Sequence, residues 1–299
     1  MALPHSSRPD ADATPSISVI ACTRNRAERL GDFFAALQTL KVSEPWQLVL
    51  VDSASTDSTH EQLRRFADSF GPHCSVQRAT RKGLGHARNV GLRAATAPVV
   101  AFFDDDCYAA PDYLAQVLTC FREQPSLGYL GGRIELFDPN DLPVTIKTSL
   151  QRQDFPARAL LRAGEIHGAN MAFRRDFLQA IGGFDEDLGA GTPFPCEDID
   201  ALARLSLAGV AGAYDPRPLV YHHHGRKSTN DFETLMRGYD AGRGAFFAKM
   251  LVSGHSIYLR PWLSRIRHQP LATTGRELAS ACRWAVYVLG RMFSGRQAS

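Results

Sequence analysis

The chain has 299 residues, of which 44% are hydrophobic and 22% are charged, and its formal net charge is +3. This is an ordinary globular composition, and the length allows one large α/β domain or two small ones with a sizeable core. No apolar run approaches the roughly 20 residues that a membrane-spanning helix needs, which argues against an integral membrane protein.

The cysteines do not indicate a disulfide framework. They show no C-x-x-C spacing, and they stand at positions 22, 74, 107, 120, 196 and 282. The first residues contain no apolar run of the kind found in secretory signals. We therefore expect free thiols in a reducing compartment and a cytoplasmic location.

The positive charge is concentrated in the last quarter of the chain. Residues 226–299 carry a net charge of +8, and residues 1–225 carry a net charge of −5. A basic tail is typical of proteins that bind nucleic acid or anionic membrane, or of a solvated helical face. No nucleic-acid-binding motif accompanies it, so we expect no nucleic acid partner. Peripheral attachment to the inner face of the membrane and a plain solvated face stay open as alternatives.

The first hundred residues predict a sheet covered by helices. Residues 1–15 are rich in Pro, Ser, Asp and Ala, which predicts a disordered N-terminus. Short apolar runs then alternate with segments whose apolar residues recur at helical spacing. The predicted strands are 17–21, 47–51, a weak one from Val76, and 99–103, and the predicted helices are 30–40, 63–70 and 89–95. This alternation is typical of βαβ units, so we expect a mostly parallel sheet.

The second half of the chain gives a less regular pattern. A helix is predicted from Pro111, and residues 138–164, which lack a clear period, predict loop and short helix. Further predicted elements are strands at 127–137 and 168–173, helices at 174–181 and 196–207, and two strands around 214 and 219–221 separated by a turn at Asp215-Pro216. Aromatic and aliphatic residues interrupted by arginines, among them Trp262 and Trp284, predict helices over residues 226–299. Such helices either pack on the protein or lie at a membrane surface.

Three consecutive carboxylates follow the strand at 99–103, namely Asp104, Asp105 and Asp106. Burying unpaired carboxylates is costly, and adjacent ones repel each other. Ligands of open α/β sheets bind beyond the carboxyl ends of strands. The pattern therefore indicates either a polar loop or a site for Mg²⁺ or Mn²⁺, ions that take oxygen ligands and substrate phosphates.

A glycine-rich segment precedes one of the predicted helices. Residues 81–88 combine two glycines with three cationic side chains. Free backbone N–H groups at the start of a helix can bind an anion. The segment matches neither G-x-x-x-x-G-K-[ST] nor G-x-G-x-x-G, so a plain loop is the alternative interpretation.

Eight stretches, taken together, resemble the family 2 glycosyltransferases and occur in that family's order over residues 16–225. They are ISVIACTRNR, LVLVDSASTDST, GLGHARNVGL, VVAFFDDDC, HGANMAFRR, IGGFDEDL, CEDID and VYHHH. The resemblance implies a GT-A fold, with a Rossmann-like nucleotide-binding half at 16–108 and an acceptor half at 109–225. Residues 226–299 then form a basic, helical C-terminal extension. The resemblance also implies a nucleotide-diphosphate sugar donor, typically UDP-linked, and one divalent metal ion.

The resemblance further implies roles for individual residues. Those expected to bind the donor are Thr23, Arg26, Asp52, Arg88 and Asp104. Asp106 is the expected metal ligand, joined by His222 or His224, and Asp198 is the expected catalytic base, with Glu197 beside it. His167 and Asn170 are expected to contact the acceptor or the donor sugar.

The chemistry of sugar transfer agrees with this assignment. Charge develops on the leaving diphosphate, where a metal ion and cations stabilise it, and the acceptor hydroxyl needs a free carboxylate as general base. We expect an inverting enzyme that acts on a glycan or glycolipid in cell-surface polysaccharide synthesis. The Q-x-x-R-W motif and the long transmembrane tail of polysaccharide synthases are missing, which predicts single additions.

Two other classes of protein stay open as alternatives. A sugar nucleotidyltransferase would have a loop rich in Gly and Lys or Arg directly after the first strand, where Ala21-Cys-Thr-Arg-Asn25 stands. A non-catalytic nucleotide-sugar-binding protein would not need candidates for both a metal ligand and a base.

Overall fold

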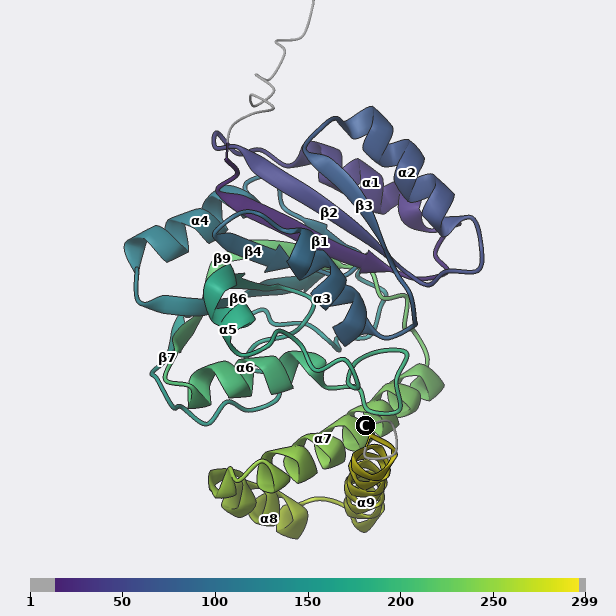
Figure 1. Cartoon of the computed structure of the whole chain (residues 1–299), viewed down its shortest axis with the longest axis vertical. Coiled ribbons are helices and arrows are strands. Elements are labelled where there is room, and N and C mark those ends of the chain that lie inside the picture. Colours follow the sequence, from purple (N-terminus) through teal and green to yellow (C-terminus); the bar gives the residue numbers. More distant parts are fainter. Residues whose placement is uncertain (1–13, 296–299) are drawn as a thin grey trace, which may run out of the picture.

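The computed structural model describes residues 14–295, with side chains described as far as residue 290. Its described residues form a nine-stranded sheet in the order β3-β2-β1-β4-β8-β6-β9-β5, with β7 paired to β9 (Figure 1). The strands are β1 (Ile17–Thr23), β2 (Trp46–Ser53), β3 (Cys74–Ala79), β4 (Val99–Phe102), β5 (Cys107–Ala109), β6 (Leu127–Leu136), β7 (Gln153–Phe155), β8 (Met171–Arg174) and β9 (Ala211–His222).

Helices cover both faces of this sheet. They are α1 (Leu30–Thr39), α2 (Thr59–Phe70), α3 (Leu84–Ala94), α4 (Tyr113–Glu123), α5 (Arg175–Ala180), α6 (Glu197–Leu207), α7 (Thr229–Val252), η1 (Ser256–Tyr258), α8 (Leu259–His268) and α9 (Leu271–Gly295). Apolar side chains of α1, α2 and α4 fill one core cluster with one face of the sheet. Those of α3, α5 and α6 fill a second cluster on the other face. The α/β fold predicted from the alternating apolar runs is confirmed.

The strand directions change halfway across the sheet. The pairs β2–β3, β1–β2 and β1–β4 are parallel, as the helical crossovers between these strands require. β8 then runs antiparallel to both of its neighbours, β4 and β6. No helix lies between β6 and β8 in the described chain, so the long loop between them returns the chain in the opposite direction. The first half is parallel as predicted, and the second half is mixed.

Two local predictions differ from the structure. β9 continues as one strand through the predicted turn at Asp215-Pro216, because the β6–β9 register shifts there. A bulge accepts proline, which cannot donate to the ladder. The short strand β7 lies in the region predicted as loop and short helix. The predicted disorder of residues 1–15 lies almost entirely outside the described residues.

The helical tail packs against the rest of the protein (Figure 1). Trp262 of α8 and Trp284 of α9 lie in one buried cluster with Leu188 and Phe194, and their exposed fractions are only 9% and 5%. The tail is helical as predicted, but these two tryptophans are core residues and are not available for a membrane surface. No helix in the described part of the chain has the length and apolarity needed to cross a bilayer.

Helix α7 approaches the loop before α6 very closely at one glycine. A Cβ atom at Gly242 would lie 1.8 Å from the carbonyl oxygen of Pro195. We expect Gly242→Ala to lower the free energy of unfolding by about 1–3 kcal/mol, because the contact is with backbone. Gly238→Ala is the matched control, since a Cβ there meets nothing within 4 Å. It should stabilise the helix by about 0.5–1 kcal/mol. Urea unfolding of both variants measures the difference, and equal stabilities would contradict this packing.

Candidate active site

Polar side chains gather at the carboxyl ends of the parallel strands. Thr23 is the last residue of β1, Asp52 lies at the end of β2, and the three aspartates follow β4. Thr23 donates a hydrogen bond to Asp105, and Arg26 lies 3.0 Å from Asp106 and 3.4 Å from Asp105. The structure therefore brings the loop after β1 together with the aspartate cluster, as expected for an open α/β sheet.

Two carboxylates of the aspartate cluster are short of positive charge. Burial raises the pKa of Asp105 to about 6, although Arg26 and Thr23 oppose that rise. Burial also raises the pKa of Asp104, against the opposing charge of Arg88. A bound cation would favour the ionised form of both carboxyl groups. The cluster therefore has the electrostatic character of a cation site.

Asp52 is a fully buried carboxylate at the end of β2. Its Oδ1 accepts a hydrogen bond of 2.9 Å from the backbone N–H of Ser55, which closes a tight turn. Its Oδ2 has no hydrogen bond partner, and it lies 3.3 Å from ring or guanidinium nitrogens of His60 and Arg78. These two side chains enclose the Oδ2 oxygen, and the binding of a nucleotide base by Asp52 stays a prediction.

Arg88 joins the two carboxylate clusters. Its guanidinium donates to Glu197 at 2.7 Å, to Asp104 at 3.1 Å and to the carbonyl oxygen of Gly168 at 3.0 Å. The side chain is only 3% exposed. We predicted a cation that serves the nucleotide. In the structure Arg88 positions Asp104 and the first turn of α6, and its role toward the nucleotide stays a prediction.

Asp198 lies in the first turn of α6, next to Glu197. Its Oδ2 accepts a hydrogen bond of 2.9 Å from the backbone N–H of Gly168, and its Oδ1 accepts one of 2.8 Å from Ile199. A Cβ atom at position 168 would lie only 2.9 Å from Asp198 Oδ2. Gly168 thus holds this carboxylate through its N–H and its lack of a side chain. We missed this role, although Gly168 stands in the HGANMAFRR stretch.

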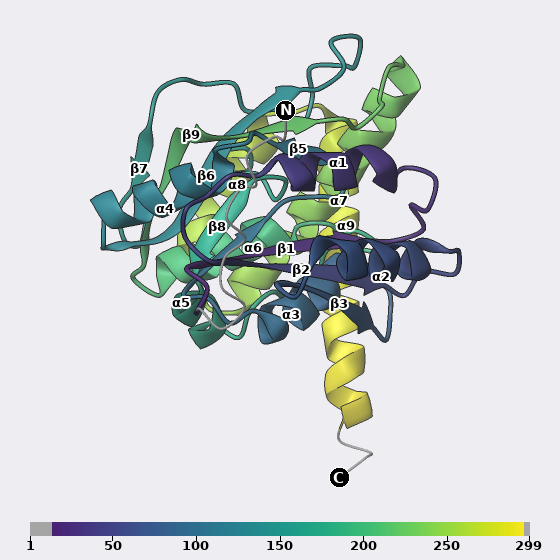
Figure 2. The ribbon, with the colours of Figure 1, turned by 90° about the horizontal axis from the view of Figure 1, so that it is seen from above.

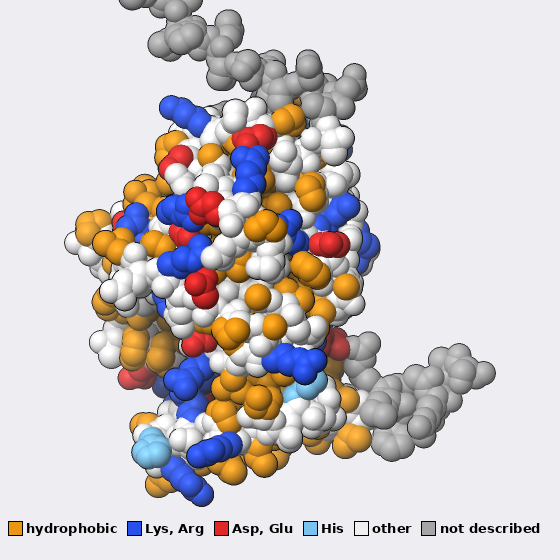
Figure 3. All heavy atoms as spheres, turned by 90° about the vertical axis from the view of Figure 1, so that its left-hand side faces the viewer, with side chains coloured by type: hydrophobic (Ala, Val, Ile, Leu, Met, Phe, Trp, Pro, Cys, Tyr) orange, Lys and Arg blue, Asp and Glu red, His pale blue; other side chains and the backbone are white. Residues whose placement is uncertain are grey.

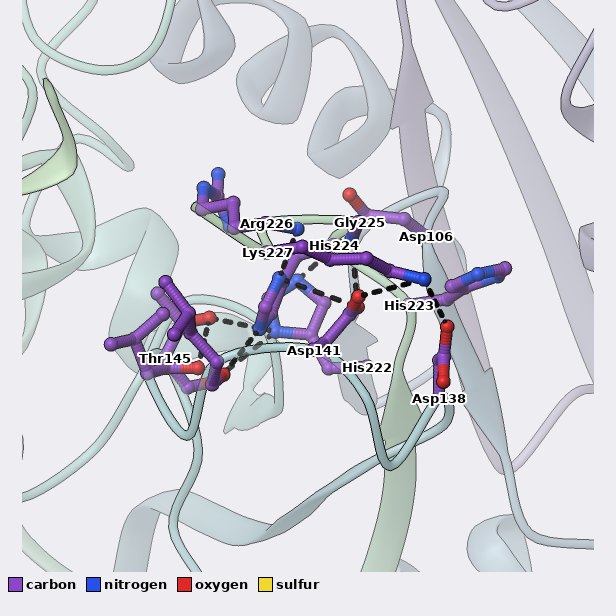
Figure 4. A network of polar contacts seen from close by, with 12 residues as sticks. Asp106, Asp138, Asp141, Thr145, His222, His223, His224, Gly225, Arg226 and Lys227 are labelled. Carbon is purple, nitrogen blue, oxygen red and sulfur yellow. Dashed lines mark hydrogen bonds and ion pairs between the residues drawn. The ribbon is translucent and has the colours of Figure 1, made fainter. Parts of the chain in front are cut away.

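Of the three adjacent histidines, His222 and His224 lie close together and His223 points the other way (Figure 4). His222 pairs across the sheet with Cys107, and its Nε2 lies 3.3 Å from Asp106 Oδ1. The ring of His223 points away from the other two and contacts Tyr108 at 3.2 Å. His224 accepts the Arg226 N–H at 3.0 Å and contacts the Leu142 carbonyl at 3.2 Å. The structure thus selects His222, and both ring nitrogens of His224 are used elsewhere.

Asp106 and His222 form a donor set that fits a hard divalent ion. Their ligand atoms and the sulfur of Cys107 lie within 4.8 Å of one another. Burial raises the pKa of the Cys107 thiol well above its usual range, and a hard ion prefers oxygen and nitrogen ligands to sulfur. One carboxylate and one imidazole leave room for substrate phosphates, as in many Mn²⁺ and Mg²⁺ sites.

The two residues predicted to contact the acceptor or sugar differ in their positions. Asn170 is 1% exposed, and its amide donates to the carbonyl oxygens of Arg133 and Pro218 and accepts from Tyr113. The amide of Asn170 thus joins strands, and a contact of Asn170 with the acceptor or sugar stays a prediction. His167 lies in the loop beside Gly168, and burial lowers its pKa while the charge of Asp198 acts against this.

The glycine-rich segment before α3 packs on protein. The N–H of Leu84 donates to the carbonyl oxygen of Ala190 at 2.9 Å, and a Cβ at Gly85 would lie 2.3 Å from the carbonyl oxygen of Asp185. Arg81 pairs with Glu186 at 2.8 Å. The structure therefore favours the plain-loop alternative over an anion site.

Lys249 of α7 helps to hold α6 in place, a role that the sequence pattern did not reveal. Its Nζ lies 2.6 Å from Asp185 and 2.5 Å from Asp200, and Asp200 stands two residues after Asp198 on α6. This pairing ties the tail to the helix that carries the expected base. A single lysine among the cations of a basic tail gives no sequence signal for such a contact.

Comparison with known proteins identifies the class and then the family. The fold resembles that of a mannosyltransferase from Pyrobaculum calidifontis in complex with GDP-Man and Mn²⁺, with a TM-score of 0.64 and 21% identity over 99% of this chain and 84% of that one. The chain thus has the GT-A fold. Residues 18–182, more than half of the chain, match the model of glycosyl transferase family 2. The chain belongs to this family.

Two curated relatives show how far the similarity extends. The pre-mycofactocin glycosyltransferase of Mycobacterium tuberculosis is 26% identical over 94% of this chain, but the chain spans only 61% of that relative's length. The O-antigen chain rhamnosyltransferase of Salmonella anatum is 25% identical over 76% of this chain and 71% of its own length. Both names describe transfer of a sugar, on different acceptors.

Proposed function

We propose that this chain is an inverting glycosyltransferase that moves a sugar from a UDP-sugar to a hydroxyl group of a glycan or lipid-linked acceptor. The observation that carries the proposal is that two clusters of acidic residues meet at one end of the sheet, with Arg88 bonded to both Asp104 and Glu197. The first cluster, Asp104 to Asp106, suits a diphosphate with its cation. The second cluster offers Asp198 as a base.

In the proposed reaction one proton is transferred, one bond forms and one bond breaks. Asp198 takes the proton of the acceptor hydroxyl, whose oxygen bonds to the anomeric carbon as the bond from that carbon to the diphosphate breaks. The Gly168 and Ile199 N–H groups hold the carboxylate in place for this step. Asp106 and His222 would hold a divalent cation, whose charge would offset that of the leaving diphosphate. Attack from the face opposite the diphosphate inverts the anomeric configuration.

The proposal also covers the domain organisation and the cellular location of the protein. Residues 16–225 form the catalytic unit, in which 16–108 bind the nucleotide and 109–225 face the acceptor, and residues 226–299 form an extension. The enzyme adds single sugars in cell-surface polysaccharide synthesis, in the cytoplasm and peripherally at the inner face of the membrane. The O-antigen relative supports this kind of acceptor.

A panel of nucleotide sugars tests the donor. Binding raises the melting temperature by mass action, so UDP- and GDP-linked sugars with Mn²⁺ can be ranked by thermal shift. We expect UDP-sugars to give the largest shift, and Asp52→Ala to abolish it. A preference for GDP-sugars, as the Pyrobaculum neighbour would predict, overturns the UDP assignment but not the class of enzyme.

The metal assignment gives a prediction with a built-in control. We expect Asp106→Asn and His222→Gln to weaken Mn²⁺ binding by more than about tenfold, since each removes a ligand. His223→Gln should leave binding near wild type, because its ring faces Tyr108. Titration calorimetry with Mn²⁺ and UDP measures the effect, and excess chelator should abolish turnover. Full activity in chelator, or normal Mn²⁺ binding by Asp106→Asn, would exclude this site.

A further inference from the structure

The outward face of α9 is an exposed apolar stripe. Leu271, Leu278, Val286 and Leu289 are 89%, 44%, 69% and 53% exposed, and exposed Cys282 lies between them. Their spacings of seven, four, four and three residues place them along one side of a helix. Exposed apolar residues that recur on one side of a helix mark an interaction surface more often than scattered ones do.

The opposite face of the same helix already has its partners. Glu277 and Ser280 are fully buried, and Trp284 is 5% exposed. Glu277 binds Arg243 of α7 and Arg265 of α8, and Ser280 donates to the carbonyl oxygen of Ala241. The helix is therefore held in place by its polar and aromatic inner face, and the outer stripe does not contribute to that packing.

The exposed charges of the chain segment that carries the stripe are of one sign. Between residues 251 and 290 the only acidic side chain is Glu277, which is buried and paired. The exposed charged residues of this segment are arginines, among them Arg260, Arg267 and Arg283. Figure 3 shows hydrophobic and basic side chains together over the lower part of the molecule, where the tail lies. Tyr287 of α9 donates a hydrogen bond to Asp187, but the exposed charges of the segment itself are cationic, and an apolar surface with such cations is complementary to an anionic one.

We infer that the outward face of α9 docks on a bilayer that contains anionic lipids, with α9 lying in the membrane interface. The inference rests on the proposed peripheral location. It places the membrane contact on the outward face of α9 and not on Trp262 and Trp284. A helix with an apolar face and flanking arginines is the usual form of an interfacial anchor. Figure 2 shows the last turns of α9 extending beyond the sheet and its helices, so that a flat surface can reach them.

A second copy of the chain fits this surface less well. An isologous pair would bring the same stripe together from both copies. Arg283 and the neighbouring arginines would then face one another with no exposed acidic residue in the described segment to offset them. Like charges placed together across an interface oppose association. Charge therefore favours the lipid surface.

Sedimentation with vesicles tests the inference on the full chain without any substrate. At low salt, wild-type protein should sediment with vesicles of equal parts phosphatidylcholine and phosphatidylglycerol, and less with phosphatidylcholine alone. Val286→Glu and Arg283→Glu should each lower partitioning by about tenfold, because they place negative charge against anionic lipid. Leu150→Glu is the matched control, since Leu150 is 71% exposed but lies outside the tail, and it should sediment like wild type.

Each other outcome overturns the inference. Wild type that ignores anionic vesicles at low salt, or Val286→Glu that partitions normally, would remove the membrane role. Light scattering without lipid measures the oligomeric state. A wild-type dimer that Val286→Glu makes monomeric would assign the stripe to a second copy. Sugar transfer to a soluble acceptor is measured separately, so loss of vesicle binding with intact transfer refutes only this inference, and the reverse refutes only the proposed function.

Discussion

Replacing Asp198 with asparagine is expected to lower kcat for sugar transfer by about 10²–10⁴-fold, the usual effect of losing a general base. The amide keeps the shape of the carboxylate, and its oxygen can still accept the Gly168 N–H. What it loses is the ability to take the proton of the acceptor hydroxyl. Affinity for UDP-sugar and Mn²⁺ should stay near wild type, because Asp104 and Asp106 are untouched.

Asp176→Asn is a matched control for this variant. Asp176 also lies in the first turn of a helix, α5, and also accepts a hydrogen bond from the next residue's N–H. It follows β8, which is antiparallel to β4, so it lies at the opposite edge of the sheet. Its replacement should leave kcat unchanged.

Three results would change the assignment of Asp198. Normal turnover by Asp198→Asn would show that another group takes the proton. Loss of donor binding would place Asp198 in the nucleotide site instead. A product with retained anomeric configuration, established by NMR, would exclude the single-base mechanism whichever residue is replaced.

The general position of the site follows from sequence because strand ends are predictable. Apolar runs ending at Thr23, Asp52 and Asp104 predicted that these residues share one edge, and the structure places them there. The direction of a parallel strand is enough to establish which end is which. Neither loop geometry nor side-chain conformation enters that argument.

The finer assignments depend on register and packing, which sequence alone does not supply. Which of three adjacent histidines faces Asp106 is decided by the pairing of His222 with Cys107 across β5 and β9. Asn170 looked like a ligand contact, yet its amide bridges strands that are distant in sequence. Trp262 and Trp284 meet only after three helices have packed. Each outcome rests on long-range contacts that leave no local pattern.

Replacing Arg88 with methionine should have the largest effect on stability. The guanidinium is the cationic partner of Glu197, whose side chain is only 8% exposed. Removing one partner of a buried ion pair leaves an uncompensated charge and costs about 3–5 kcal/mol. The cost of losing Arg88 is smaller for Asp104, because its side chain is 34% exposed and keeps contact with water. Urea unfolding measures the loss, and turnover should fall with it because Asp104 and α6 lose their link.

The loss should depend on pH in a defined direction. Burial raises the pKa of Glu197 to about 7 even though Arg88 opposes the rise, and removing Arg88 raises it further. A carboxyl group whose pKa is higher in the folded than in the unfolded protein binds a proton more tightly when folded. Stability therefore falls as pH rises from the unfolded pKa through the folded one. Arg88→Met should lie closer to wild type at mildly acidic pH than at alkaline pH.

A double variant separates the structural role of Arg88 from its role in the site. Adding Glu197→Leu to Arg88→Met removes the buried charge, and replacing both partners of a buried ion pair by apolar residues is often neutral for stability. We expect the double variant to regain most of the lost stability and to lack the pH dependence that Glu197 causes, while turnover stays low because nothing holds Asp104 near α6. Recovery of turnover along with stability would show that Arg88 serves only to neutralise Glu197. If Arg88→Met unfolds like wild type at every pH, the ion pair does not carry the stability assigned to it.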